Sequence, residues 1–288
     1  MKRLFAALSI SKRALRRLPG LLAIGFLPFA PVALAESNAT ATVSSQVVEN
    51  EVVEKQTVKG RLVIIIDDIG NHFELGQRAI ELPGKLNYAV LPHTPQGTRL
   101  ARYASAKGVG KEVLLHMPME AMGEQILGPA GLYNRLSREE FVSRIDRALA
   151  EIPNAQGVSN HMGSFLTQQR DKMNWLMAEL NQRDLYFLDS RTASTSSARG
   201  AAQDHKVPYL ARDFFLDHKR NAEAMEGIMN RAIQSAEANG FAVVIGHPYR
   251  STLSFLEKQL PTLQERGIAL LNVSEAIARE SRRLASLN

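Results

Sequence analysis

Two adjacent carboxylates follow the most apolar segment of the sequence. The run LVIII at 62–66 leads directly into Asp67 and Asp68, and Gly70 follows two residues later. Burial of an unpaired carboxylate costs free energy, so both side chains require a cation, a proton or water nearby. Because neighbouring residues of a strand point to opposite sides of a sheet, we expect the two aspartates to point apart and to have different roles.

Histidines follow other apolar segments in the same way. Of the seven histidines, five lie at or just beyond the end of a segment with strand character, and three of these are the main candidates: His116 in LLHMPME, His161 in NHMGS and His247 in IGHP. Carboxylate oxygens together with imidazole nitrogens are the donor set that a divalent metal such as zinc prefers. The other histidines are interpreted as structural: His72, His93, His205 and His218.

The elements that must position these residues alternate along the chain. The predicted strands are 62–67, 86–91, 112–117, 156–161, 185–189, 207–216, 242–247 and 268–273. Amphipathic segments of helical length lie between them, at 73–82, 97–107, 137–152, 170–183, 219–239, 251–265 and 274–286. Several strands are continuous apolar runs, which is typical of parallel strands covered on both faces.

This alternation predicts an α/β fold with a single parallel (β/α) barrel of seven or eight strands, which need not be regular. A doubly wound open sheet is the alternative. In both architectures the active residues lie at the carboxyl ends of the strands, so the strand ends are where the chemistry is expected.

The first 35 residues have the composition of an export signal. Six basic residues between Lys2 and Arg17 precede an apolar run from Leu21, and Ala33-Leu34-Ala35 fits a cleavage site. We expect a signal peptide at 1–35, a flexible tether rich in Ser, Thr, Val and Glu at 36–59 and one domain at 60–288. An uncleaved anchor is the alternative. The expected location is the periplasm, with membrane contact only during export.

The charge and the absence of cysteine exclude several function classes. Six of the 35 basic residues lie in the predicted leader, which leaves 29 basic and 29 acidic residues in a neutral mature chain. The sequence therefore does not favour nucleic-acid binding. Because the chain has no cysteine, thiol catalysis and Cys-ligated metal sites are excluded, and no disulfide framework exists.

Five motifs, in order IIDDIG, LLHMPME, NHMGS, LDSRT and IGHP, resemble the divergent branch of the polysaccharide deacetylases. The resemblance covers nearly all of residues 61–280. It implies a metal-dependent carbohydrate esterase acting on N-acetylated glycans, with zinc or a similar ion as the cofactor. By position it makes Asp67 the general base, Asp68 a metal ligand and His247 the general acid.

The sequence departs from the parent family at the metal-binding histidines. The parent family has two histidines four residues apart, whereas here His116 is followed at that spacing by Glu120. Either Glu120 or His161 from the next strand is expected to complete the metal site. Four further residues are expected to orient these groups or to contact the substrate: Ser164, Asp189, Arg191 and Tyr133.

Two functions remain open at this point. The first is a periplasmic metal-dependent deacetylase that removes acetyl groups from an N-acetylated glycan such as peptidoglycan or an exopolysaccharide. The second is a catalytically inactive relative that uses the same site, at the carboxyl ends of the strands, to bind a glycan or an envelope partner. The sequence leaves the oligomeric state open.

Overall fold

The computed structural model describes residues 57–108 and 110–286. The predicted leader and nearly all of the predicted tether lie outside these residues. The strands are β1 (Gly60–Ile69), β2 (Leu86–Val90), β3 (Lys111–Met119), β4 (Gly157–Met162), β5 (Tyr186–Asp189), β6 (Tyr209–Ala211), β7 (Phe214–Phe215), β8 (Ala242–Gly246) and β9 (Ile268–Leu270). The α-helices are α1 (Phe73–Glu81), α2 (Gly97–Ala106), α3 (Arg138–Glu151), α4 (Arg170–Asn181), α5 (Ala198–Asp204), α6 (Ala222–Asn239), α7 (Arg250–Glu265) and α8 (Val273–Ala285).

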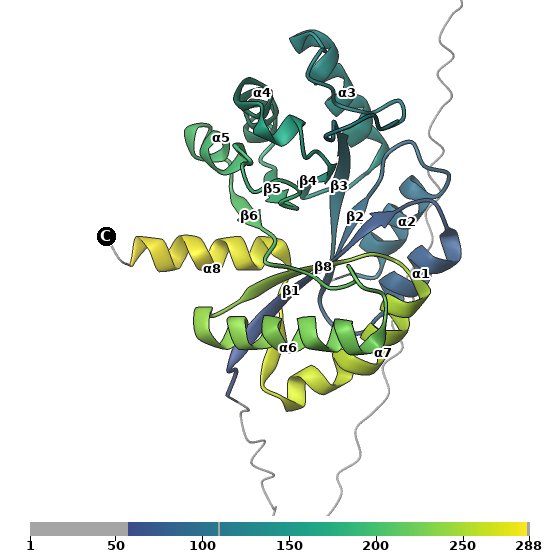
Figure 1. Ribbon diagram of the computed structural model, residues 1–288, viewed down its shortest axis with the longest axis vertical. Coiled ribbons are helices and arrows are strands. Elements are labelled where there is room, and N and C mark those ends of the chain that lie inside the picture. The colour runs from purple at the N-terminus through teal and green to yellow at the C-terminus, as the bar shows by residue number, and fades with distance from the viewer. Residues whose placement is uncertain (1–56, 109, 287–288) are drawn as a thin grey trace, which may run out of the picture. The chain divides into compact units, whose positions relative to one another are not determined.

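The strands form one parallel, curled sheet (Figure 1). Their order is β6-β5-β4-β3-β2-β1-β8-β7, and β9 pairs with the amino end of β1. The order follows the sequence without the reversal that defines a doubly wound sheet. The predicted (β/α) barrel is therefore confirmed, in an irregular form in which β6 and β7 flank an opening because they do not pair with each other.

The prediction of one strand over 207–216 is wrong. The segment is broken at Arg212 and Asp213 into β6, which pairs with β5, and β7, which pairs with β8. The Arg212 guanidinium donates to the carbonyls of Ser190 and Arg191 on the β5 side, whereas the Asp213 N–H donates to the carbonyl of Val243 on β8. The chain thus crosses the opening between the two edges, which a single strand could not do.

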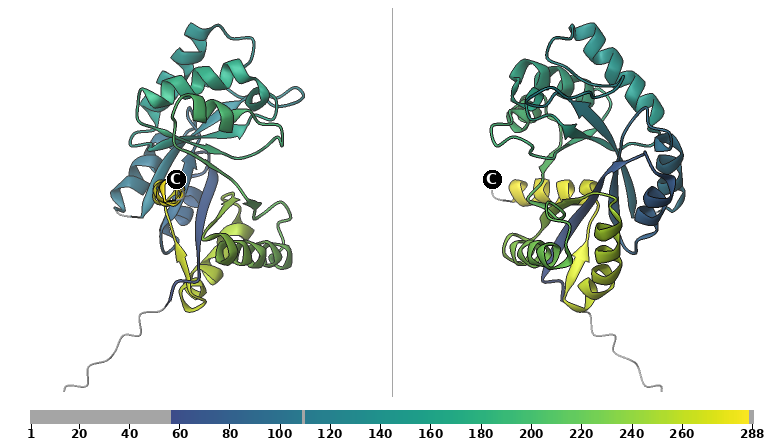
Figure 2. Two further views of the ribbon diagram at one scale, coloured as in Figure 1. Left: turned by 90° about the vertical axis from the view of Figure 1, so that its left-hand side faces the viewer. Right: turned by 45° about the vertical axis from the view of Figure 1, so that its right-hand side comes forward.

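Helices α1 to α7 cover the outer face of the sheet and enclose its main core (Figure 2). Alternate residues of each strand pack there, such as Ile64 and Ile66 of β1 against Met229 of α6. Ser137 caps α3, since its hydroxyl accepts from the N–H of Glu140. None of the described helices is both long enough and apolar enough to span a membrane.

The C-terminal helix α8 packs on the inner side of the sheet and runs between β6 and α6 (Figure 1). Val273, Ala276 and Ile277 join Val63 and Ile65 of β1 in a second, smaller apolar cluster. This helix therefore fills the space that a closed barrel would fill with strand side chains.

A buried carboxylate anchors the start of α8. The Glu112 side chain accepts hydrogen bonds from the Tyr186 hydroxyl, at 2.6 Å, and from the Ser274 N–H, at 3.1 Å, and it also accepts from the Ser274 hydroxyl. Asn87 accepts from the N–H of Val273 at 3.0 Å. These two residues of β2 and β3 satisfy amide groups that the first turn of a helix leaves unpaired.

Substitution of Glu112 tests this anchor. Glu112→Ala leaves the Tyr186 hydroxyl and the first turn of α8 without acceptors, so we expect the free energy of unfolding to fall by about 3 kcal/mol in urea denaturation. Glu124→Ala, at an exposed glutamate, is the matched control and should change it by less than about 0.5 kcal/mol. If the two substitutions lower the free energy of unfolding equally, Glu112 does not anchor α8.

Candidate metal centre and active site

The two aspartates occupy an irregular end of β1. The pairing of β1 with β2 shifts register between Ile66 and Ile69, and Asp68 has a φ of 57°. Aspartate is among the few residues that adopt this left-handed conformation at moderate cost. The positive φ interrupts the alternation of the strand, so the expectation that the two carboxylates point apart is wrong. Both face His116, whose Nε2 lies 3.6 Å from Asp67 Oδ2 and 3.2 Å from Asp68 Oδ1.

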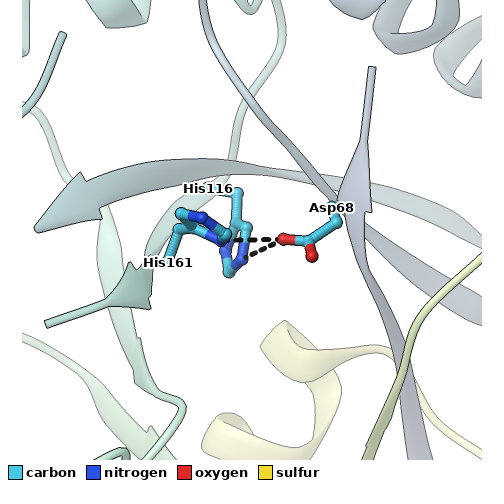
Figure 3. Close-up of side chains that lie close together, drawn as sticks. All are labelled: Asp68, His116 and His161. Atoms are coloured by element: carbon cyan, nitrogen blue, oxygen red, sulfur yellow. Dashed lines mark ion pairs between the residues drawn. The ribbon is translucent and has the colours of Figure 1, made fainter. Parts of the chain in front are cut away.

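Asp68, His116 and His161 bring their ligand atoms together, from β1, β3 and β4 (Figure 3). One carboxylate oxygen and two imidazole nitrogens all lie within 4.8 Å of one another. Asp68 Oδ1 is 2.8 Å from His161 Nδ1, and this oxygen is buried without a hydrogen-bond partner among the described residues. The two nitrogens approach it without the orientation of a hydrogen-bond donor.

This donor set fits a divalent metal ion. Two imidazoles and a carboxylate are the three protein ligands typical of a catalytic zinc site, and zinc takes such ligands at about 2.0–2.2 Å. The buried, unpartnered oxygen of Asp68 is the observation that most directly calls for a cation.

Electrostatics at the cluster favour a charged Asp68. Burial raises its pKa, but the imidazoles of His116 and His161, whose nitrogens lie 3.2 and 2.8 Å from Oδ1, outweigh burial and hold the pKa well below its ordinary value. Burial lowers the pKa of His116, yet the charges of Asp67 and Asp68 raise it overall. Ser159 Oγ lies 2.8 Å from His116 Nδ1, which leaves Nε2 to face the carboxylates.

Asp67 differs from its neighbour in burial and in contacts. Its side chain is almost fully buried, and its Oδ1 has no hydrogen-bond partner within the described part of the chain. Burial raises the pKa of this carboxyl, and the nearby imidazoles of His116 and His247 counteract only part of the effect. A carboxylate whose pKa is raised in this way binds a proton more readily than Asp68 does.

His247 lies on the other side of Asp68, just after β8, and is held by Asp217. Its Nδ1 is 2.9 Å from Asp217 Oδ1, and its own N–H donates to Asp217 Oδ2 at 2.6 Å. Its Nε2 is 3.9 Å from Asp68 Oδ2. Burial lowers the pKa of His247, but the hydrogen bond and charge of Asp217 raise it overall. The Thr252 hydroxyl also donates to Asp217 Oδ2 at 2.9 Å, which holds this carboxylate in place.

Asp217 was not among the predicted site residues. A signal is present in the sequence, since Asp217 directly follows the apolar stretch FFL at the end of a predicted strand. In the folded chain β7 pairs with β8, and this pairing places Asp217 beside His247.

The remaining predicted residues have other contacts. The Glu120 carboxylate accepts from the N–H of Asn134 at 2.6 Å, so His161 and not Glu120 joins the ligand cluster. The Ser164 hydroxyl accepts from the N–H of Met122, and the Tyr133 hydroxyl accepts from the N–H of Leu127.

Asp189 and Arg191, at the end of β5, also contact neighbouring segments. The Asp189 carboxylate accepts from the Arg191 N–H, the Ser196 hydroxyl and the Tyr209 hydroxyl. Arg191 lines a cavity of about 280 Å³ beside α8. Together with the contacts of Glu120, Ser164 and Tyr133, these interactions order the loops around the carboxyl ends of the strands.

A cavity of about 350 Å³ adjoins the cluster. Asp68 and His247 line it together with Tyr249 and with residues 69–72, 75 and 76. A pocket of this size is at the lower end of the range for small-molecule sites. The ligand cluster and the His247–Asp217 pair therefore lie beside a space that a substrate group can enter.

The sequence matches the family described as divergent polysaccharide deacetylase over residues 64–277. The chain belongs to this family. An uncharacterised Escherichia coli protein, YibQ, is 35% identical over 204 residues, which are 71% of this chain and 63% of the E. coli protein, less than two thirds of its length. An uncharacterised protein of Haemophilus influenzae is 33% identical over 207 residues, covering 72% of this chain and 73% of that protein.

A solved structure of an uncharacterised Agrobacterium tumefaciens protein has the same fold. Its TM-score is 0.72 at 24% sequence identity, over 75% of this chain and 89% of the other. The deacetylase-like fold expected from the sequence motifs is therefore established.

Metal titration tests the ligand cluster. We expect the domain to bind one divalent ion, and His161→Ala to weaken zinc binding by more than about 100-fold in calorimetry, because loss of a direct ligand exceeds the 10–100-fold cost of losing an outer-shell partner. Ser159→Ala should weaken zinc binding by about 10-fold, because the His116 ring loses its contact at Nδ1. His93→Ala removes a histidine outside the cluster and serves as control; if it matched His161→Ala, the assignment would be wrong.

The His247–Asp217 pair is tested by titration of the imidazole. We expect Asp217→Asn to lower the pKa of His247 in an NMR titration of the metal-free protein, because the neutral amide no longer stabilises the imidazolium. Asp213→Asn changes a nearby aspartate that accepts from the N–H of Val243 instead and should leave that pKa in place. An unchanged pKa in Asp217→Asn would contradict the pairing.

Proposed function

We propose that this protein is a metal-dependent deacetylase that hydrolyses the acetamide groups of an N-acetylated glycan outside the cytoplasm. The observation that carries the proposal is the convergence of Asp68, His116 and His161 on one point, with Asp67 and His247 on either side of it. Family membership supports the reaction class, and the predicted export signal supports the location.

Asp68, His116 and His161 would hold a divalent cation, zinc in our proposal, and such an ion would supply the Lewis acidity that activates water and polarises the acetamide carbonyl. Ser159 orients one ligand through His116 Nδ1. The carboxylate of Asp68 stays ionised at all physiological pH values because its pKa lies far below them. It therefore remains a ligand and does not compete for the proton of the water.

Asp67 is the proton acceptor in this mechanism. Its buried carboxylate takes a proton as the water oxygen bonds to the carbonyl carbon, and its raised pKa makes it a better base than Asp68. His247 donates a proton to the amide nitrogen as the C–N bond breaks, so the products are acetate and a free amine. Asp217 holds His247 Nδ1 and presents Nε2 toward Asp68 and the cavity.

The alternative, a catalytically inactive glycan-binding protein, was motivated by the missing second histidine of the parent motif. His161 supplies an imidazole from the neighbouring strand. The cluster thus contains two histidines and an aspartate in spite of the altered spacing. Deacetylation gives a role to the His247–Asp217 pair, whereas glycan binding alone requires no such pair. Deacetylation therefore explains more of the side chains at this site.

Substitutions on either side of the cluster test the proposal. We expect release of acetate from N-acetylated oligosaccharides to fall by at least about 100-fold in Asp68→Ala and in His247→Ala, and to cease on chelation and return with zinc. If His247→Ala binds zinc as tightly as the unsubstituted protein, its loss of activity comes from loss of the proton donor and not from loss of the metal. The proposal fails if the metal-loaded protein releases no acetate from glycans that it binds.

A further inference from the structure

The segment 216–220, between β7 and α6, contacts the candidate active site on one side and lines a second cavity on the other. Asp217 holds His247, and the guanidinium of Arg220 lies 3.6 Å above the ring of Tyr249, which lines the catalytic cavity. Leu216, His218 and Lys219 line the second cavity, of about 500 Å³. The two spaces are thus separated by only one short segment of chain.

The second cavity carries cations without anionic partners. Lys219 and Arg231 line it together with His218, and within residues 57–108 and 110–286 none of the three forms an ion pair. No aspartate or glutamate is among the residues that line this cavity. A cavity lined by basic side chains and by no carboxylate attracts anionic groups.

A glycine in the interior of a helix also lines this cavity. Gly227 lies in the second turn of α6, between Ala224 and Ile228 on the same face. Glycine is unfavourable in a helix interior, and here no close packing requires it, because a Cβ at this position would meet no atom within 4 Å. Because Gly227 is exposed and has no side chain, the helix backbone there permits close approach of a ligand.

The distribution of charge and apolar surface indicates the chemistry of the ligand. The cations come from different elements, the loop before α6 and α6 itself, and the apolar side chains of Leu216 and Ile228 also line the cavity. Lysine and arginine side chains bind a carboxylate through charge-assisted hydrogen bonds, and the apolar side chains offer contact to the C–H face of the sugar ring that carries it.

We propose that this cavity is a subsite for a carboxylate-bearing unit of the glycan, so that the protein takes an acidic N-acetylated polysaccharide. This inference rests on the proposed function for the reaction and adds the class of polysaccharide. Segment 216–220 then has two roles: Asp217 orients His247, and Lys219 binds a neighbouring acidic sugar.

Binding to the metal-free protein tests the subsite independently of catalysis. The acidic probe is a hyaluronan tetrasaccharide, in which glucuronate alternates with N-acetylglucosamine, and the neutral probe is N-acetylchitotetraose. We expect the double variant Lys219→Ala/Arg231→Ala to bind the acidic probe about tenfold more weakly in calorimetry, with the neutral probe unaffected. Lys258→Ala/Arg282→Ala removes the same charge from exposed positions elsewhere and should change neither affinity.

Gly227→Glu supplies a second test that does not weaken the fold. Glutamate is a better helix former than glycine, so the melting temperature should not fall, whereas a carboxylate in the cavity should repel the acidic probe and leave the neutral one unaffected. The inference is overturned if both probes bind alike, or if the cavity variants match the controls. Retained binding of the acidic probe, together with absence of acetate release by the unsubstituted, metal-loaded protein, would reject the deacetylase proposal and leave the subsite intact.

Discussion

The approach of two imidazole nitrogens to one buried oxygen of Asp68 is the interaction on which the rest of the account depends. His116 Nε2 and His161 Nδ1 lie 3.2 and 2.8 Å from it. Without a shared cation, the oxygen is buried and lacks a hydrogen-bond partner among the described residues, at a cost that native structures avoid. The irregular end of β1, with Asp68 at positive φ, is what directs the carboxylate there.

Much of this arrangement could be predicted from the sequence, because parallel strands place distant residues at one edge. Continuous apolar runs indicated the strands, and polar residues at their ends indicated Asp68, His116, His161 and His247. The break in 207–216 could not be predicted, since it depends on tertiary contacts of Arg212 with Ser190 and Arg191.

Other errors have related physical causes. The common orientation of the two aspartates depends on one backbone dihedral angle, which an alternating pattern does not encode. Glu120 has the spacing of a ligand, but its carboxylate accepts from the N–H of Asn134 in the following loop, a contact that only the folded chain reveals. Helix α5, of seven residues, was too short to give a clear periodic signal.

In the described domain, the buried polar groups at the two ends of the sheet differ in whether they have hydrogen-bond partners. At the amino ends, Glu112 and Asn87 are fully partnered and hold α8 in place. At the carboxyl ends, Asp67 and Asp68 carry buried oxygens without hydrogen-bond partners in the described residues. A buried hydrogen-bond network in which every group has a partner stabilises a fold. Buried polar groups without partners are characteristic of sites that act on a ligand.

X-ray absorption at the zinc edge tests the central claim most directly. The account predicts that the purified domain contains one zinc per chain, with two imidazole nitrogens in its first shell at about 2.0–2.1 Å, and that His161→Ala removes one of them. A protein that retains no stoichiometric metal, or a metal whose shell contains no imidazole, would contradict it.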